Sequence, residues 1–212
     1  MDATDAAELI SEIREERASH EADDQFRDRA AMLIAILAML LAVGSLGGGN
    51  VAEDMVHNNI KASDTWAFYQ AKNVRQTQYR IAVDQMEAQL AADAGLPPQV
   101  RADMEETVEK YKATIARYDD EPDPAAPGDS LRGEGKKQLS AQARSYEVLR
   151  ERASAQDSNF DFSEVAFQLA IVLGSVAILA LSRKVLYISM GLGVIGALLM
   201  INGFALLFPL PF

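Results

Sequence analysis

Three glycines near the C-terminus carry the spacing of a nucleotide-binding loop. Gly191, Gly193 and Gly196 match the G-x-G-x-x-G fingerprint, which holds a dinucleotide pyrophosphate where a strand turns into a helix. That chemistry needs a preceding strand and a polar opening, whereas these glycines lie inside the charge-free residues 185–208. The sequence therefore predicts glycines that let helices approach closely, and no bound cofactor.

Acidic and histidine side chains give no convincing metal site. The acidic run at residues 119–123 places carboxylates at alternate positions, as a calcium loop does, but Pro124 stands where such loops need Gly. The two histidines, His20 and His57, lie on opposite sides of the charge-free residues 30–49, and there is no cysteine. No Ser-His-Asp constellation, H-E-x-x-H motif or phosphate-binding loop is visible in the sequence. We therefore expect no metal, no catalytic residues and no enzymatic activity.

Three charge-free stretches organise the chain. They cover residues 30–49, 165–182 and 185–208, and every Lys, Arg, Asp and Glu lies outside them. At a rise of about 1.5 Å per residue, helices of these lengths reach about 30, 27 and 36 Å, against a hydrocarbon core of about 30 Å. The predicted fold class is an all-α integral membrane protein with three transmembrane helices. A helical-hairpin soluble domain, residues 50–164, is inserted between spans one and two.

Basic residues near the spans predict the orientation. Spans two and three must turn at Arg183 and Lys184, the only charges between them. These two share a side with the four arginines of the acidic N-terminal helix, residues 1–29, whereas few basic residues border the spans on the other side. We expect a bacterial inner-membrane protein with a cytoplasmic N-terminus and periplasmic residues 50–164. The inverted topology stays open, because the rule binds weakly for so long a loop.

Residues 50–164 are predicted to form helices that are interrupted at two places. Residues 51–94 hold Ile60, Ala67, Val74, Ile81 and Ala88 at intervals of seven, a stripe that predicts close packing of a coiled-coil type on a neighbour. After a Gly-Leu-Pro-Pro break, a second helix carries an apolar seam of Met104, Val108, Tyr111, Ile115 and Tyr118. Residues 119–135 are rich in Pro and Gly and predict an exposed, mobile loop, and residues 136–155 resume the helix. We expect a bundle of three helical segments that leads into span two.

The net charge of the chain limits the classes of molecule expected to bind it. The net charge is −11, and residues 1–29 and 50–164 each carry more acids than bases. An acidic surface repels phosphate backbones, so no nucleic acid is expected as a partner. Membrane lipid is the partner that the apolar stretches predict.

Small and polar residues inside the spans are candidates for contacts between helices. Ser189, Gly193 and Ala197 repeat every four residues in span three, a spacing that favours close helix packing in lipid. We expect this face to be free for a neighbouring subunit. Gln168 and Asn202 are amides that can hydrogen-bond between helices or subunits, or line a pore.

One segment after the first span resembles a known family. Residues 60–72 read I-K-A-S-D-T-W-A-F-Y-Q-A-K and contain the only tryptophan. This stretch is similar to the hallmark of the bacterial membrane family called domain of unknown function 4337, and the resemblance extends more loosely over residues 26–208. The resemblance implies no activity.

The residues of that segment can also be read physically. On a helix, one close-packing face holds Ile60, Ser63, Ala67, Ala71 and Val74, and Lys61 and Asp64 pair three residues apart. Trp66, Phe68 and Tyr69 flank that face. We interpret these residues as a packing interface, with a ligand pocket as the alternative.

A non-enzymatic, oligomeric membrane scaffold is the function that these patterns favour. Its mechanism is association between helices, and its expected partners are lipid, further copies of the chain and an unidentified protein. Two alternatives come from other classes. A small-solute transporter or channel would have a water-filled path along Gln168 and Asn202, and an envelope sensor or binding module would have a pocket bordered by Trp66 and Tyr69.

Overall fold

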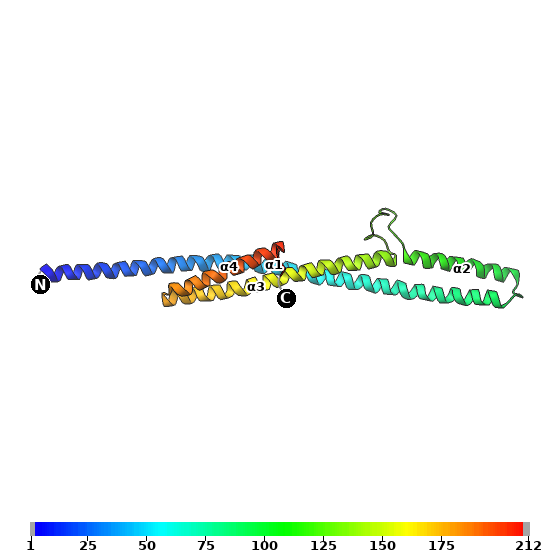
Figure 1. Ribbon diagram of the computed structural model, residues 1–212, viewed down its shortest axis with the longest axis horizontal. Coiled ribbons are helices and arrows are strands. Elements are labelled where there is room, and N and C mark those ends of the chain that lie inside the picture. Colours follow the sequence, from blue (N-terminus) through cyan, green and yellow to red (C-terminus); the bar gives the residue numbers. More distant parts are fainter. Residues whose placement is uncertain (1–2, 210–212) are drawn as a thin grey trace. The chain divides into compact units, whose positions relative to one another are not determined.

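The computed structural model is all-helical, as the sequence predicts, and describes the backbone of residues 3–209 and the side chains of residues 13–209. Residues 1–2 of the predicted N-terminal helix lie outside the described residues. Figure 1 shows the four helices, which are α1 (Ala3–Ala92), α2 (Pro98–Asp119), α3 (Lys136–Ala180) and α4 (Arg183–Ala205).

The helices form two compact units. The apolar unit comprises Met1–Glu53 and Ala153–Phe212, and the polar unit comprises Asp54–Arg152. Helices α1 and α3 contribute to both units, and α2 and α4 to one unit each.

Two boundaries predicted from the sequence, at residues 49/50 and 164/165, fall inside the continuous helices α1 and α3. Gly47, Gly48 and Gly49 lie inside α1, where the sequence suggested an exit from the first span. Glycine weakens a helix in isolation, but a Cβ at Gly47 would lie 2.8 Å from the rings of Phe160 and Phe204. The helix continues there because glycine is what allows those rings to pack on its backbone. The predicted segment 136–155 and residues 165–180 of the second predicted span likewise lie in a single helix, α3.

In the apolar unit, large side chains pack directly against glycines of neighbouring helices. Leu37 of α1 and Phe167 of α3, both buried, form its hydrophobic core with Ala170. A Cβ at Gly193 would lie 2.6 Å from Leu37, and one at Gly196 would lie 3.0 Å from the Phe167 ring. Close approach of the three helices therefore depends on glycines in α4 that face α1 and α3.

Aromatic residues that the sequence suggested for the membrane surface belong partly to this packing. The positions of Phe160, Phe162 and Phe167 at the start of the second charge-free stretch predict an aromatic belt at the membrane surface. Phe160 and Phe167 are instead 2% and 0% exposed, and only Phe162 is exposed, at 46%. The glycines of α1 and α4 explain the difference, because they create the space that the two buried rings fill.

The chain reverses between α3 and α4 at Leu181 and Ser182, just before Arg183 and Lys184, where the sequence predicts the turn; these two basic residues instead begin α4. Helix α3 ends at Ala180 and α4 begins at Arg183, without a glycine or proline between them. Leu181 takes the left-handed conformation, with φ of 47°. Non-glycine residues pay a cost for that geometry, so the turn is held by the packing on either side of it. Ser189 Oγ donates a hydrogen bond of 2.6 Å to the Ala170 carbonyl and so joins the two helices.

In the polar unit, α2 and α3 pair with consecutive lengths of α1. Lys112 of α2 contacts Glu87 of α1 at 2.8 Å, whereas Lys136 of α3 contacts Asn73 of α1 at 3.1 Å. Both pairings are antiparallel. Two helices therefore lie side by side at any level of this unit, where the sequence suggested a bundle of three segments (Figure 1).

Candidate functional site

The segment at residues 60–72 lies in α1, and its two faces have opposite surroundings. The face turned toward α3 carries Ala62 and Lys72, which are 4% and 5% exposed, and the half-buried Trp66 and Tyr69. The other face carries the candidate interface residues Ile60, Ser63, Ala67 and Ala71, all of them exposed. Within the chain, the packed face is thus the aromatic and polar one.

That exposed face extends along α1 as a stripe of apolar residues, which we call the α1 stripe. It comprises Ile60, Ala67, Val74, Ile81 and Ala88, all exposed. Ile60, Val74 and Ile81 are 52%, 58% and 52% exposed. The inner side of α1 has its own spacing of three and four residues, filled by Tyr69, Lys72, Gln76, Tyr79, Val83, Met86 and Leu90, none of them exposed. The helix therefore has two heptad faces, and only one of them is covered by the described chain.

Lys61 and Asp64 do not form the ion pair that their spacing suggested. The Lys61 ammonium instead lies 5.4 Å from the centre of the Tyr146 ring on α3, a cation–π contact. Asp64 lines an open groove of about 380 Å³ with Phe68 and residues of the loop and α3. Lys61 therefore contacts Tyr146 of α3 and not Asp64.

Trp66 fastens α1 to α3. Its indole N–H donates a hydrogen bond of 2.8 Å to Glu147 Oε1. Its ring meets Tyr69 edge to face at 5.5 Å, and the Lys136 ammonium lies 5.9 Å from the Tyr69 ring centre. Trp66 and Tyr69 do not line the nearby groove. These contacts are those of a packing interface within the chain.

Lys72 is the most buried charge of the polar unit. Its ammonium lies 2.9 Å from Glu121 Oε2 and 3.7 Å from Glu134 Oε2, and it also donates to the Glu134 carbonyl. The rings of Phe68 and Tyr118 lie 5.4 Å and 5.3 Å from it. A buried ammonium is tolerated only with partners of this kind, so Lys72 joins α1 to both ends of the loop between α2 and α3.

The ends of that loop are tied to each other. The Glu134 N–H donates to the Glu121 carbonyl at 2.9 Å, beside an isolated β-bridge between Pro122 and Gly133. Gly133 has φ of 117°, and a Cβ there would lie 2.2 Å from the Glu121 oxygen. Only glycine fits this position. The predicted mobility of residues 119–135 thus stays a prediction for the tip of the loop, because its neck is hydrogen-bonded.

Two aspartates at the end of α2 are held in their charged form. A hydrogen bond from Gln76 is the main cause that lowers the pKa of Asp119, and Lys136 and Arg80 lower it further. Hydrogen bonds from Gln138 and then Lys137 lower the pKa of Asp120. Both carboxylates therefore act as fixed acceptors at the junction of α2 and α3.

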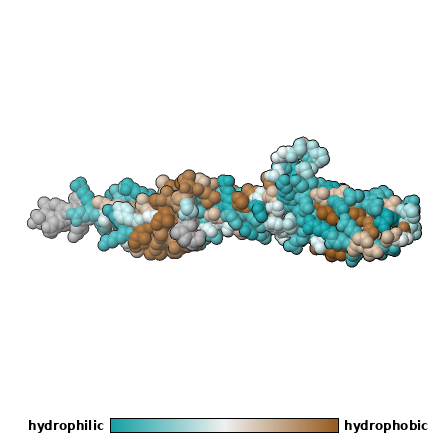
Figure 2. All heavy atoms as spheres, turned by 45° about the vertical axis from the view of Figure 1, so that its right-hand side comes forward, coloured by the Kyte–Doolittle hydropathy of each residue, from teal (hydrophilic) through white to brown (hydrophobic). Residues whose placement is uncertain are grey.

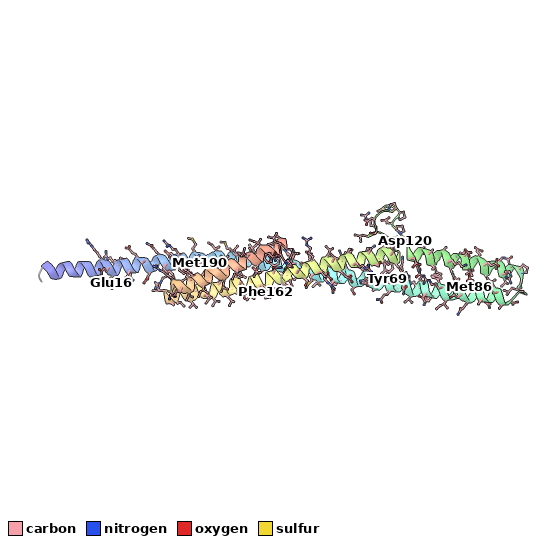
Figure 3. The ribbon with its side chains drawn as sticks, in the orientation of Figure 1. Glu16, Tyr69, Met86, Asp120, Phe162 and Met190 are labelled. Atoms are coloured by element: carbon pink, nitrogen blue, oxygen red, sulfur yellow. The ribbon has the colours of Figure 1, made fainter. Side chains whose placement is uncertain are left out.

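The seam predicted on the second helix faces α1. Val108 is 4% exposed, and the other seam residues are half-buried. Tyr79 of α1 meets the rings of Tyr111 and Tyr118 at 4.9 Å and 6.1 Å, both edge to face. Figure 3 labels Tyr69, Met86 and Asp120, which mark the packed side of α1 and the end of this seam.

The small-residue face of α4 is occupied inside the chain. Ser189 is 0% exposed and bonded to α3, and Gly193 lies against Leu37 of α1. Ala197 packs against the apolar core. The expectation that this face stays free for a neighbouring subunit is therefore wrong, because α1 lies on it. The sequence could not show that the first span uses the same face as the hairpin.

The two candidate amides of the apolar unit do not come together. Asn202 is 0% exposed, and its side-chain N–H donates to Asn159 Oδ1 at 2.7 Å and to the Phe208 carbonyl at 2.9 Å. Gln168 is exposed and bonds to Glu164 at 3.1 Å. Asn202 caps the end of the bundle, and among the described residues the two amides have no hydrogen-bond partner in common.

Sequence reasoning missed Lys72, Gln76 and Asn159 as residues that position the helices. Gln76 is 1% exposed and donates to the Ile115 carbonyl at 2.8 Å, and Asn159 is the buried partner of Asn202. The spacing of Tyr69, Lys72, Gln76 and Tyr79 by three and four residues places them on one face of a helix. Because Lys72 and Gln76 are polar, the sequence did not indicate that this face is buried. Their partners lie far along the chain, where no local pattern points to them.

The chemistry of these sites is that of helix association. Ion pairs, amide hydrogen bonds and aromatic contacts fasten α1 to α2, to the loop and to α3. Within the residues whose side chains are described, no three His, Cys, Asp or Glu side chains gather as metal ligands would. No curated protein and no solved structure matches this chain. A family match covers residues 26–206, most of the sequence, and the chain belongs to the family described as Domain of unknown function (DUF4337).

Proposed function

We propose that this chain is a multi-pass membrane protein that serves as a non-enzymatic, oligomeric scaffold, and that its copies associate through the α1 stripe. The single observation that carries the proposal is the exposure of Ile60, Val74 and Ile81, which belong to one seven-residue repeat, on the side of α1 that α2 and α3 leave uncovered.

Membrane insertion is supported by the outer surface of the apolar unit. Helices α1, α3 and α4 are long and apolar enough to cross a membrane. Met32, Leu46 and Leu179 are 68%, 68% and 86% exposed, and Figure 2 shows brown, apolar atoms gathered over this unit. In water, an exposed apolar surface of this size would lead to aggregation, whereas lipid solvates it. Ser163, Ser189 and Asn202 turn their polar atoms inward, as lipid requires.

The proposed orientation places the N-terminus in the bacterial cytoplasm and the polar unit in the periplasm. Arg29, Arg183 and Lys184 border the apolar helices on the proposed cytoplasmic side. A reporter that works only in the periplasm should therefore be active when fused after Pro127 and inactive when fused between Arg183 and Lys184. The reverse result would invert the topology and leave the apolar bundle unchanged.

Copies inserted in one bilayer with the same topology meet with their α1 helices parallel. A two-fold axis along the membrane normal would then bring each stripe residue against its own counterpart. Around Val74 the neighbouring seam positions are uncharged, since they hold Gln70, Ala71, Asn73, Thr77 and Gln78. No like charges therefore oppose this register at the middle of the stripe. Confinement to two dimensions raises the effective concentration, so a modest apolar seam suffices.

The absence of cysteine makes a disulfide scan a direct test. Single cysteines are introduced at Val74, at Ile81 and, as a matched control, at Arg75, an exposed neighbour about 100° further around the helix. Mild oxidation in native membranes should cross-link Val74→Cys and Ile81→Cys into dimers at least about fivefold faster than Arg75→Cys, because only the first two lie at the seam. Equal rates at the three positions, or no cross-link at any, would reject the stripe as the interface.

A further inference from the structure

A hollow of the apolar unit lies between α1 and the start of α4. Its volume is about 450 Å³. Nine residues line it, namely Ala22, Gln25, Phe26, Arg29 and Leu33 of α1 and Arg183, Leu186, Tyr187 and Met190 of α4. Met190, at its apolar end, is labelled in Figure 3. None of the nine carries a negative charge.

The two arginines of this groove, Arg29 and Arg183, have no ion-pair partner among the residues whose side chains the structure describes. Arg27, two residues away from Arg29, does reach an acid, Asp24, at 3.8 Å. Free guanidiniums facing one hollow favour an anion with several oxygen acceptors, which a phosphate provides.

The start of α4 adds to the attraction for an anion. Arg183 is its first residue, and the N-cap residue, Ser182, makes no side-chain capping hydrogen bond. The first backbone N–H groups of a helix lack partners inside the helix and carry partial positive charge. An anion held by Arg183 therefore also lies near the positive end of the α4 dipole.

The remaining walls fit the apolar part of a lipid. Arg29 is the last charged residue before the charge-free residues 30–49, so its guanidinium lies at the boundary between polar and apolar sequence. Beyond it, Leu33 and Met190 continue the groove along the apolar helices, and Tyr187 and Met190 are 68% and 45% exposed. The groove is thus charged at one end, apolar at the other and open along its side.

We propose that this groove, which we call the Arg29–Arg183 groove, binds an anionic phospholipid, with the phosphate between the two guanidiniums and an acyl chain along Leu33 and Met190. Basic hollows between membrane helices are suited to such headgroups. The inference rests on the proposed insertion into a membrane and holds for either orientation. A lipid bound there would bridge α1 and α4 at the end of the bundle where α4 begins.

The test uses the full chain in detergent and native mass spectrometry with defined lipids. Phosphatidylglycerol should bind about 25-fold more tightly than phosphatidylcholine, because each basic residue near an anionic headgroup contributes about fivefold. The double variant Arg29→Gln/Arg183→Gln should lose that preference. Its matched control, Arg27→Gln/Lys184→Gln, makes the same change in net charge at residues that do not line the groove and should keep it.

Two further arms separate the possible outcomes. An excess of inorganic phosphate should leave phosphatidylglycerol bound, and displacement by phosphate would mean a site for the free ion. Equal loss of the preference in both double variants would attribute the effect to net charge and would overturn the proposed lipid site.

Helical content and resistance to alkaline extraction from membranes are measured for each variant. Failure to insert would refute the membrane proposal itself, whereas insertion without a lipid preference would refute only the groove.

Discussion

The indole nitrogen of Trp66 and the carboxylate of Glu147 lie 2.8 Å apart although 81 positions separate them in the sequence. This bond joins α1 to α3 inside the polar unit. It also orients α1, because the side that carries Trp66 faces α3 while the α1 stripe faces away. The same helix therefore holds the chain together on one side and leaves an apolar seam on the other.

Trp66→Ala should lower the free energy of unfolding by about 2 kcal/mol. A fully buried Trp costs about 3 to 5 kcal/mol when it is truncated, and this ring is half-buried. Trp66→Phe should recover the packing but not the hydrogen bond, which leaves a deficit of about 1 kcal/mol. Thermal unfolding of the two variants measures both values. Full recovery with Phe would mean that the bond to Glu147 contributes nothing.

Lys72→Met should destabilise the junction of α1 with the loop by about 2 kcal/mol. The substitution keeps the apolar stem but leaves Glu121 and Glu134 without the ammonium that lies between them. The Lys72 side chain is 6% exposed, so solvent screens its ion pairs little. Lys110→Met is the matched control, because its pair with Glu106 is exposed and screened by solvent, so its loss should lower the stability much less. Equal losses in the two variants would contradict this account of Lys72.

Acid should weaken the polar unit through Asp119 and Asp120. Their folded pKa values are lowered by hydrogen bonds, so their contribution is present above the unfolded pKa, about 3.9, and is lost as the pH falls through the folded values. The stability of the wild type should therefore fall progressively below about pH 5. In the variant Asp119→Asn/Asp120→Asn, the free energy of unfolding, measured by chemical unfolding, should fall less steeply as the pH is lowered. An unchanged slope would show that these carboxylates are not coupled to folding.

Gly193→Leu should lower the stability of the apolar bundle by about 2 kcal/mol, since overpacking forces neighbours to move. A Cβ at this position would lie 2.6 Å from the Leu37 side chain. Gly191→Leu is the control, because nothing lies within 4 Å of a Cβ there and the residue is exposed. Thermal unfolding in nanodiscs compares the two. Equal tolerance of both would contradict the contact between α1 and α4.

The sequence predicted the elements of this fold better than their partners. Three charge-free stretches identified the apolar helices, because the absence of charge is a local property. The continuity of α1 through Gly47 could not be foreseen, since it depends on rings of α3 and α4. The inner face of α1 was also missed. Lys72 and Gln76 occupy it only because Glu121 and the Ile115 carbonyl are there to receive them, and both partners are distant in sequence.

The interface candidates fall into two groups, those packed inside the chain and those left exposed, and the sequence could not separate them because the packing partners are distant in sequence. Ser189 and Gly193 are small, and small residues favour close packing, but spacing alone cannot tell a neighbour within the chain from one in another copy. The structure assigns both residues to contacts inside the chain. The α1 stripe has the opposite outcome, since its apolar residues find no cover among the described residues.

The mass of the full chain in native nanodiscs tests the central claim, that copies associate through the α1 stripe. The wild type should have a mass of two or more chains, and Val74→Gln/Ile81→Gln should shift toward one chain because both substitutions place an amide on the exposed seam. The control is Val148→Gln, which changes a valine that is 63% exposed on α3 and should leave the mass unaltered. A wild type with the mass of a single chain, or a stripe variant that stays assembled, would contradict the account.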